Sequence, residues 1–158
     1  MEVFGQTDIG RLRTVNQDAF ATRIFSYDLA VVAVCDGMGG AKSGEIASEV
    51  ALESFISDIG HAFEEGNLTI GTEDTVAAAV AKAGAAVRAR AASDPDCEGM
   101  GTTLVAAVVI DTEAIIANVG DSRAYHVSDG SILRVTRDHS VVEDMVARGE
   151  LTDRKSVV

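Results

Sequence analysis

The stretch VVAVCDGMGG, residues 31–40, shapes the interpretation of the whole chain, because an apolar run leads straight into a carboxylate and then into glycines. The run of Val, Ala and Cys is typical of a buried strand. Asp36 follows it, and Gly37, Gly39 and Gly40 leave the backbone after it almost bare. Bare backbone beside a negative charge suggests a bound metal ion, a bound phosphate or a tight turn. For Asp36 taken alone a turn is favoured, because Asp and Gly are common turn residues.

Composition indicates one globular domain over residues 1–158, with 47% hydrophobic and 24% charged residues. The formal net charge of −12 argues against nucleic-acid partners and anionic membranes, and it supplies carboxylates for hard cations. Cys35 and Cys97 form no metal-binding motif and are expected as reduced thiols. No signal peptide or membrane-length apolar run is visible, so we expect a cytoplasmic protein with no membrane partner.

Apolar periodicity predicts an α+β protein, because strands, two helices, further strands and a last helix follow one another without regular βαβ alternation. The later strands are expected to form an antiparallel meander, because turn signals separate them. The expected strands cover residues 2–8, 19–25, 29–35, 102–110, 113–120, 122–127 and 131–136, and the expected helices cover 44–63, about 72 to the SDPD at 93–96, and 140–152.

Candidate chemistry gathers where carboxylates or an arginine stand beside glycines and strand ends. Asp18, Asp36 and Asp121 each have a simpler interpretation alone, as a strand cap or a turn. Together they are oxygen ligands, with the Gly37 carbonyl as a fourth, and oxygen is the ligand that Mg²⁺ and Mn²⁺ prefer. Arg13 offers a fork that grips phosphate. Attack of metal-activated water on a phosphate is the reaction that this set favours.

Four segments carry a resemblance to a known family. TDIGRLRTVNQDAF (7–20), VVAVCDGMGGAKSGEIAS (31–48), GMGTTLVAAVV (99–109) and the segment from Ala117 to Thr152 occur in the order and spacing of the metal-dependent (PPM) serine/threonine protein phosphatases of type 2C, bacterial type. The resemblance implies two antiparallel sheets stacked as a sandwich, with helices on both outer faces in four layers (α-β-β-α). It also implies a centre with two Mn²⁺ or Mg²⁺ ions in a cleft between the sheets.

The resemblance also implies a role for each candidate residue. Asp36 would bridge two metal ions, the Gly37 carbonyl would coordinate one of them, and Asp18 would hold metal-bound water. Arg13 would bind the substrate phosphate, and Asp121 matches a carboxylate that helps to hold a third, weaker ion. A metal-bridging hydroxide would then attack phosphorus, with Arg13 and Asp36 as catalytic residues.

The family normally continues beyond the position of Val158, with two more aspartates that bind the metals directly. We therefore expect this chain to correspond to the N-terminal two-thirds of such a domain, truncated before those ligands. The chain alone is expected to bind Mn²⁺ weakly and to have weak or no phosphatase activity. An open sheet edge is expected to favour a dimer or a strand swap.

Two functional hypotheses follow from the resemblance. The first is an enzyme that removes phosphate from phosphoserine and phosphothreonine in proteins phosphorylated by a Ser/Thr kinase. The second is a truncated or non-catalytic module that binds a phosphorylated partner. A nucleotide-binding loop at DGMGG is a weak third interpretation, because the segment lacks the GxGxxG spacing and the βαβ setting.

Overall fold

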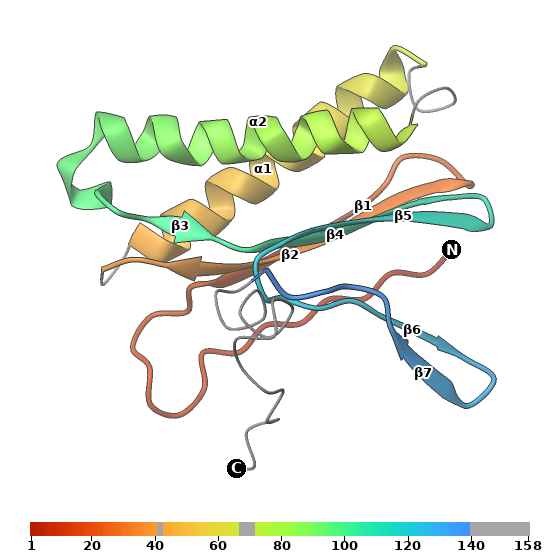
Figure 1. Ribbon diagram of the computed structural model, residues 1–158, viewed down its shortest axis with the longest axis horizontal. Coiled ribbons are helices and arrows are strands. Elements are labelled where there is room, and N and C mark those ends of the chain that lie inside the picture. The colour runs from red at the N-terminus through yellow and green to blue at the C-terminus, as the bar shows by residue number, and fades with distance from the viewer. Residues whose placement is uncertain (41–42, 67–71, 140–158) are drawn as a thin grey trace, which may run out of the picture.

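The computed structural model describes residues 1–40, 43–66 and 72–139 (Figure 1). Within these residues the largest element is a five-stranded antiparallel sheet, and a separate two-stranded sheet follows it in the chain. The large sheet has the order β1 (Asp18–Ile24), β2 (Leu29–Met38), β4 (Leu104–Ile110) and β5 (Glu113–Val119), with the short β3 (Gly101–Thr102) also paired to β2, and the small sheet joins β6 (Tyr125–Ser128) to β7 (Ser131–Arg134).

Two long helices, α1 (Ser43–Glu64) and α2 (Thr72–Ser93), cover one face of the large sheet (Figure 1). The 3₁₀ helix η1 (Pro95–Cys97) leads from α2 towards β3. The core lies between the helices and the sheet, where small side chains on the helices allow close approach. Its fully buried members include Phe55 and Ile59 of α1, and Val31, Cys35 and Val108 of the sheet.

The opposite face of the sheet carries the candidate site. Side chains alternate along β2, so that Val31, Ala33 and Cys35 face the helices while Val34 and Asp36 face away from them. Figure 1 shows the N-terminal segment and the β6–β7 hairpin on this second side. Within the described residues, no helix has the length and apolar character needed to cross a membrane.

The structure confirms the α+β class, both long helices and the two hairpins β1–β2 and β4–β5. Between β6 and β7 the predicted SDG turn is also present, with Asp129 and Gly130 at φ 47° and 77°, as a type I′ turn requires. The continuous meander is wrong, because β6 pairs with β7 and not with β5. The helix expected over 140–152 lies outside the described residues.

The strand expected over residues 2–8 is also wrong. This segment crosses the outer face of the sheet, and it pairs with none of the described strands. Gly5 rests against the Phe20 ring, where a Cβ would come within 2.2 Å of a ring carbon. The alternation of apolar and polar side chains in residues 2–8 therefore reflects packing of this segment on the face of the sheet, and not backbone pairing with an edge strand.

Candidate metal centre

Asp18 of β1 and Asp36 of β2 lie directly opposite each other across the antiparallel pair. The neighbouring pair carries the ladder bond, since the Gly37 amide donates to the Gln17 carbonyl at 3.0 Å. Asp18 and Asp36 therefore occupy a non-hydrogen-bonded position, where facing side chains approach most closely. Two carboxylates are thus held side by side on the outer face of the sheet.

This pairing is electrostatically unfavourable without a cation. Partial desolvation and the adjacent Asp18 carboxylate raise the pKa of Asp36 above its ordinary value, and Asp121 acts in the same direction. The Arg13 guanidinium opposes the shift, which places its charge within electrostatic range of Asp36. The other three charged residues predicted from the sequence therefore all lie within electrostatic range of Asp36 in the folded chain.

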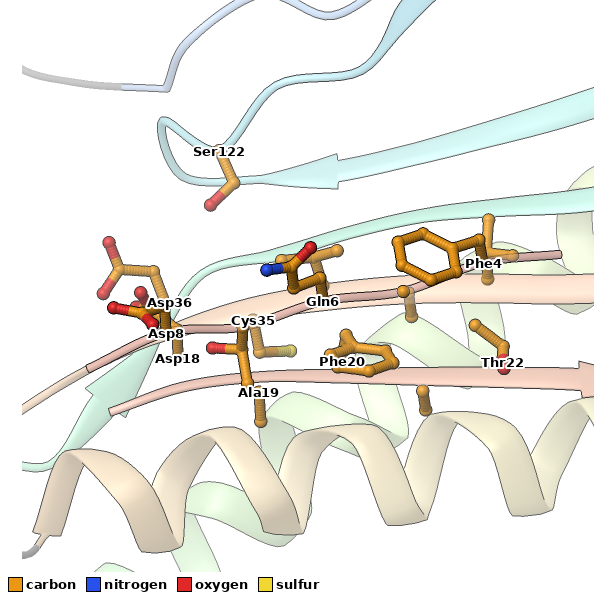
Figure 2. A pocket seen from close by; sticks show the side chains of 16 residues that line it. Phe4, Gln6, Asp8, Asp18, Ala19, Phe20, Thr22, Cys35, Asp36 and Ser122 are labelled. Atoms are coloured by element: carbon orange, nitrogen blue, oxygen red, sulfur yellow. The ribbon is translucent and has the colours of Figure 1, made fainter. Parts of the chain in front are cut away.

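A cleft of about 630 Å³ lies over these carboxylates, and Figure 2 shows Asp8, Asp18 and Asp36 together at one end of it. Its remaining wall is largely apolar and includes Phe4 and Phe20. Asp8 was missed from the sequence. Its carboxylate accepts a hydrogen bond from the Gly10 amide at 2.7 Å, so Asp8 shapes the loop towards Arg13.

The prediction that Asp36 taken alone marks a turn is wrong, because β2 continues through Asp36 and Gly37 to Met38. Two threonines of the neighbouring β3–β4 segment bind the backbone of Asp36. The Asp36 amide donates to the Thr103 hydroxyl at 2.9 Å, and the Thr103 amide donates to the Asp36 carbonyl at 2.9 Å. The Thr102 hydroxyl donates to the same carbonyl at 3.1 Å. The GMGTT segment therefore fixes the strand that presents the central carboxylate.

The backbone at Gly37 is enclosed by neighbouring backbone and does not border open space. It is buried, and a Cβ placed there would lie 1.9 Å from the Gly44 carbonyl oxygen and 2.8 Å from that of Gln17. Gly44 is equally restricted by Gln17 and Gly37. The first turn of α1 thus fills the volume that a side chain would take, which fixes the Gly37 backbone rather than leaving room around it.

Asp121 lies in the turn after β5 and is exposed. The preceding Gly120 has φ 97° and packs against Thr103, whose methyl carbon would be 2.7 Å from an added Cβ. The next residue, Ser122, lines the cleft, and its hydroxyl lies 2.6 Å from that of Thr103. The turn that carries Asp121 is therefore joined to the strand that carries Asp36.

An ion pair between the exposed Arg123 and the buried Asp138 fixes the other side of the same turn, and no sequence pattern indicated it. The Asp138 carboxylate accepts bonds from Arg123 Nε at 3.0 Å and Nη2 at 2.6 Å, and it also accepts one from Arg134. The hydrogen bonds from Arg123 lower the pKa of Asp138. Arg123 of GDSR is thus structural, because it anchors the turn to the segment after β7.

The donor set fits a divalent hard cation in part. Asp18 and Asp36 supply paired carboxylate oxygens whose repulsion a cation would relieve, and Mg²⁺ and Mn²⁺ retain several waters when protein ligands are few. In the described part of the chain, however, no three His, Cys, Asp or Glu side chains lie close enough together to enclose a metal ion. The described residues thus offer two facing carboxylates to a cation, but they do not enclose one.

A family model described as protein phosphatase 2C matches residues 10–148. The chain belongs to the protein phosphatase 2C family. Among curated relatives, serine/threonine phosphatase stp of Listeria welshimeri is 35% identical over 150 residues, covering 93% of this chain and 58% of the relative. Protein phosphatase PhpP of Streptococcus pneumoniae is 32% identical over 157 residues, covering 99% and 62% respectively.

Solved structures of this family share the fold. The catalytic domain of the serine/threonine protein phosphatase PstP, in complex with two manganese ions, matches with a TM-score of 0.74 and 32% identity. That match covers 94% of this chain and 60% of the PstP chain. The chain thus spans about three fifths of the length of the relatives it matches.

Proposed function

We propose that residues 1–158 form the N-terminal part of a single metal-dependent protein phosphatase domain, which hydrolyses phosphoserine and phosphothreonine in proteins. The observation that carries this proposal is the facing pair of Asp18 and Asp36 on the cleft side of the sheet, with Arg13 in electrostatic range. Membership of the protein phosphatase 2C family supports it. The PstP domain with two manganese ions supports Mn²⁺ as the cofactor, and Mg²⁺ has the same preference for oxygen ligands.

The chain's own residues would hold two ions from one side. Asp36 would supply the bridging carboxylate, Asp18 a second carboxylate, and Gly37 a backbone carbonyl. Asp121 would contribute to a third, weaker ion, because it lies in electrostatic range of Asp36 on the turn after β5. Bound divalent ions would supply positive charge for phosphoryl oxygens and lower the pKa of water.

Arg13 would bind the substrate phosphate. Its side chain is exposed, and none of the ion pairs between described residues includes it. A guanidinium can contact two phosphate oxygens at once, which orients the phosphorus towards the carboxylate pair. The Asp8 loop would help to position Arg13, since the bond from the Gly10 amide shapes the approach to it.

A second candidate function is a non-catalytic module that binds a phosphorylated partner. Among the described residues no third His, Cys, Asp or Glu side chain completes a metal site, and this favours the binding module for the 158-residue chain alone. In that case Arg13 and a weakly held cation would bind phosphate without turnover. Either function implies partner proteins phosphorylated by a Ser/Thr kinase.

Two further proposals concern the setting of the chain. Cys35 and Cys97 are both free and buried, which supports a reducing compartment such as the cytoplasm.

β1 and β5 are the outermost strands of the described large sheet, and unpaired edges favour pairing with a second copy. Sedimentation at increasing concentration should therefore show a dimer, and a monomer at all concentrations would contradict this proposal.

One experiment separates the two functions. Mn²⁺ binding to the 158-residue chain is measured by water-proton relaxation, and release of phosphate from a phosphothreonine peptide is measured in the same buffer. Asp36→Asn should weaken Mn²⁺ binding at least about tenfold. Asp111→Asn is the matched control, because it removes one exposed carboxylate at the opposite end of the β4–β5 hairpin from Asp121.

The outcomes are distinct. Mn²⁺-dependent phosphate release that Asp36→Asn abolishes would support the enzyme. Mn²⁺-dependent peptide binding without release would support the module for this chain. If Asp36→Asn and Asp111→Asn bound Mn²⁺ as tightly as the parent chain, the proposed metal centre would be wrong.

A further inference from the structure

Thr103 occupies an unusual place in the sheet. The ladder between β2 and the β3–β4 segment keeps one register throughout, from Val34 opposite Val105 to Gly37 opposite Thr102. Asp36 is therefore opposite Thr103, where the Asp36 amide would ordinarily donate to a backbone carbonyl. It donates instead to the Thr103 hydroxyl at 2.9 Å.

Because the Thr103 hydroxyl accepts this bond, its proton and its second lone pair remain for other partners. Thr103 is 4% exposed, so its hydroxyl needs partners within the protein. It accepts from the Asp36 amide, and its oxygen lies 2.6 Å from the Ser122 hydroxyl. A threonine hydroxyl has one proton and two lone pairs, so both contacts can be made together. In Figure 2 the Ser122 hydroxyl points from its turn towards the strands below.

Close packing between Gly120 and Thr103 also holds the Asp121 turn against the sheet. Gly120 has φ 97°, and a Cβ there would lie 2.7 Å from the Thr103 methyl group. Thr103 is thus held between the Gly120 backbone and the Ser122 hydroxyl, the two residues that flank Asp121. The methyl group and the hydroxyl of one side chain locate this turn.

We infer that Thr103 and Ser122 are positioning residues that fix the Asp121 carboxylate relative to Asp36. This inference rests on the proposed metal centre for its functional meaning, but the bridge itself is a property of the metal-free fold. Neither hydroxyl is offered as a metal ligand. Both act through the backbone that presents the carboxylates, as hydrogen-bonded outer groups do at other metal sites.

The first test needs no metal. Thr103→Val keeps the branched shape and removes the hydroxyl, and Thr103→Ser is the matched control that restores it. Amide exchange and chemical shifts are measured by NMR on the metal-free chain. Thr103→Val should speed exchange of the Asp36 amide at least about tenfold and shift the Asp121 amide resonance. Thr103→Ser, which keeps the hydroxyl but loses the methyl group, should leave Asp36 exchange unchanged and shift the Asp121 resonance less.

The second test measures Mn²⁺ affinity by water-proton relaxation. Thr103→Val and Ser122→Ala should each weaken binding about tenfold, the lower end of outer-group effects. The double variant should bind no more weakly than Thr103→Val, because both substitutions break one bridge. Ser122→Ala leaves the backbone bonds of Asp36 in place, so it remains informative if Thr103→Val fails to fold.

The inference is overturned if Asp36 exchange and the Asp121 resonance are unchanged in Thr103→Val, or if Thr103→Ser is as impaired as Thr103→Val. Losses in Mn²⁺ affinity that multiply in the double variant would also overturn it. If the parent chain showed no Mn²⁺ binding, the proposed metal centre would fail, whereas the metal-free NMR comparison would still decide whether the bridge exists.

Discussion

Replacement of Gly37 by alanine should destabilise the fold more than any other single methyl addition near the cleft. The added Cβ would lie 1.9 Å from the Gly44 carbonyl oxygen, about 1.1 Å short of the 3.0 Å below which Cβ contacts essentially never fall. The obstructing atoms belong to backbone, in α1 and at Gln17, so no side chain can rotate away. Overpacking of this kind costs up to about 3 kcal/mol. For a chain of this length that corresponds to a loss of about 6–12 °C in Tm.

Chemical unfolding followed by far-UV circular dichroism measures this difference directly. Gly40→Ala is the matched control, because the nearest atom to its Cβ is the Ser43 hydroxyl oxygen at 3.8 Å, an ordinary contact. That control should be unchanged or more stable by about 0.5 kcal/mol, through lower entropy of the unfolded chain. If Gly37→Ala unfolded within about 0.5 kcal/mol of the control, the close contact between β2 and α1 would not exist as described.

Three further predictions concern other parts of the chain. Gly84→Ala should stabilise the protein by about 0.5–1 kcal/mol in chemical unfolding, because Gly84 lies inside α2 and its nearest neighbour is the flexible end of Arg88; a loss of stability would show that the helix has no space there. Asp138→Asn should lower stability by about 2 kcal/mol at pH 7 by weakening bonds to two arginines. Since the pKa of Asp138 is lowered in the folded chain, the parent's advantage should decline as pH falls below about 4 and be lost once pH is below that lowered pKa. The pKa of Asp36 is raised, so ionisation of its carboxyl destabilises the metal-free fold, and Asp36→Asn should gain stability relative to the parent as pH rises above about 4. Equal dependence of stability on pH in the two proteins would contradict the repulsion between Asp36 and Asp18.

Local sequence patterns predicted the two long helices and the hairpins β1–β2, β4–β5 and β6–β7, because each is decided by neighbouring residues. The apolar spacing in α1 and the Asp-Gly turn between β6 and β7 need no distant partner. Residues 2–8 failed for the complementary reason. Their alternation is compatible with a strand, but a strand exists only where another strand edge is available, and sequence spacing does not reveal that.

Sequence patterns led to candidate residues for the site but not to the groups that support them. Asp18, Asp36, Asp121 and Arg13 were expected together, and in the structure the other three all affect the pKa of Asp36; their roles stay predictions. The Thr103 bridge could not be predicted, because it depends on a hydroxyl replacing a carbonyl in one rung of a ladder. The contact between Gly37 and α1 could not be predicted either, since sequence cannot distinguish a glycine beside a ligand from a glycine beneath a helix.

Asp36 breaks two rules of strand design at once, and this explains why its surroundings are so constrained. Asp is unfavourable within strands, and like charges directly opposite each other destabilise a sheet. The strand persists because Thr102, Thr103 and the α1 contact at Gly37 hold its backbone independently of the carboxylate. A cation that binds only the folded chain would relieve the repulsion and stabilise the fold in proportion to its affinity. Under the proposed metal centre, the stability lost by placing Asp36 opposite Asp18 would thus be recovered when a divalent ion binds.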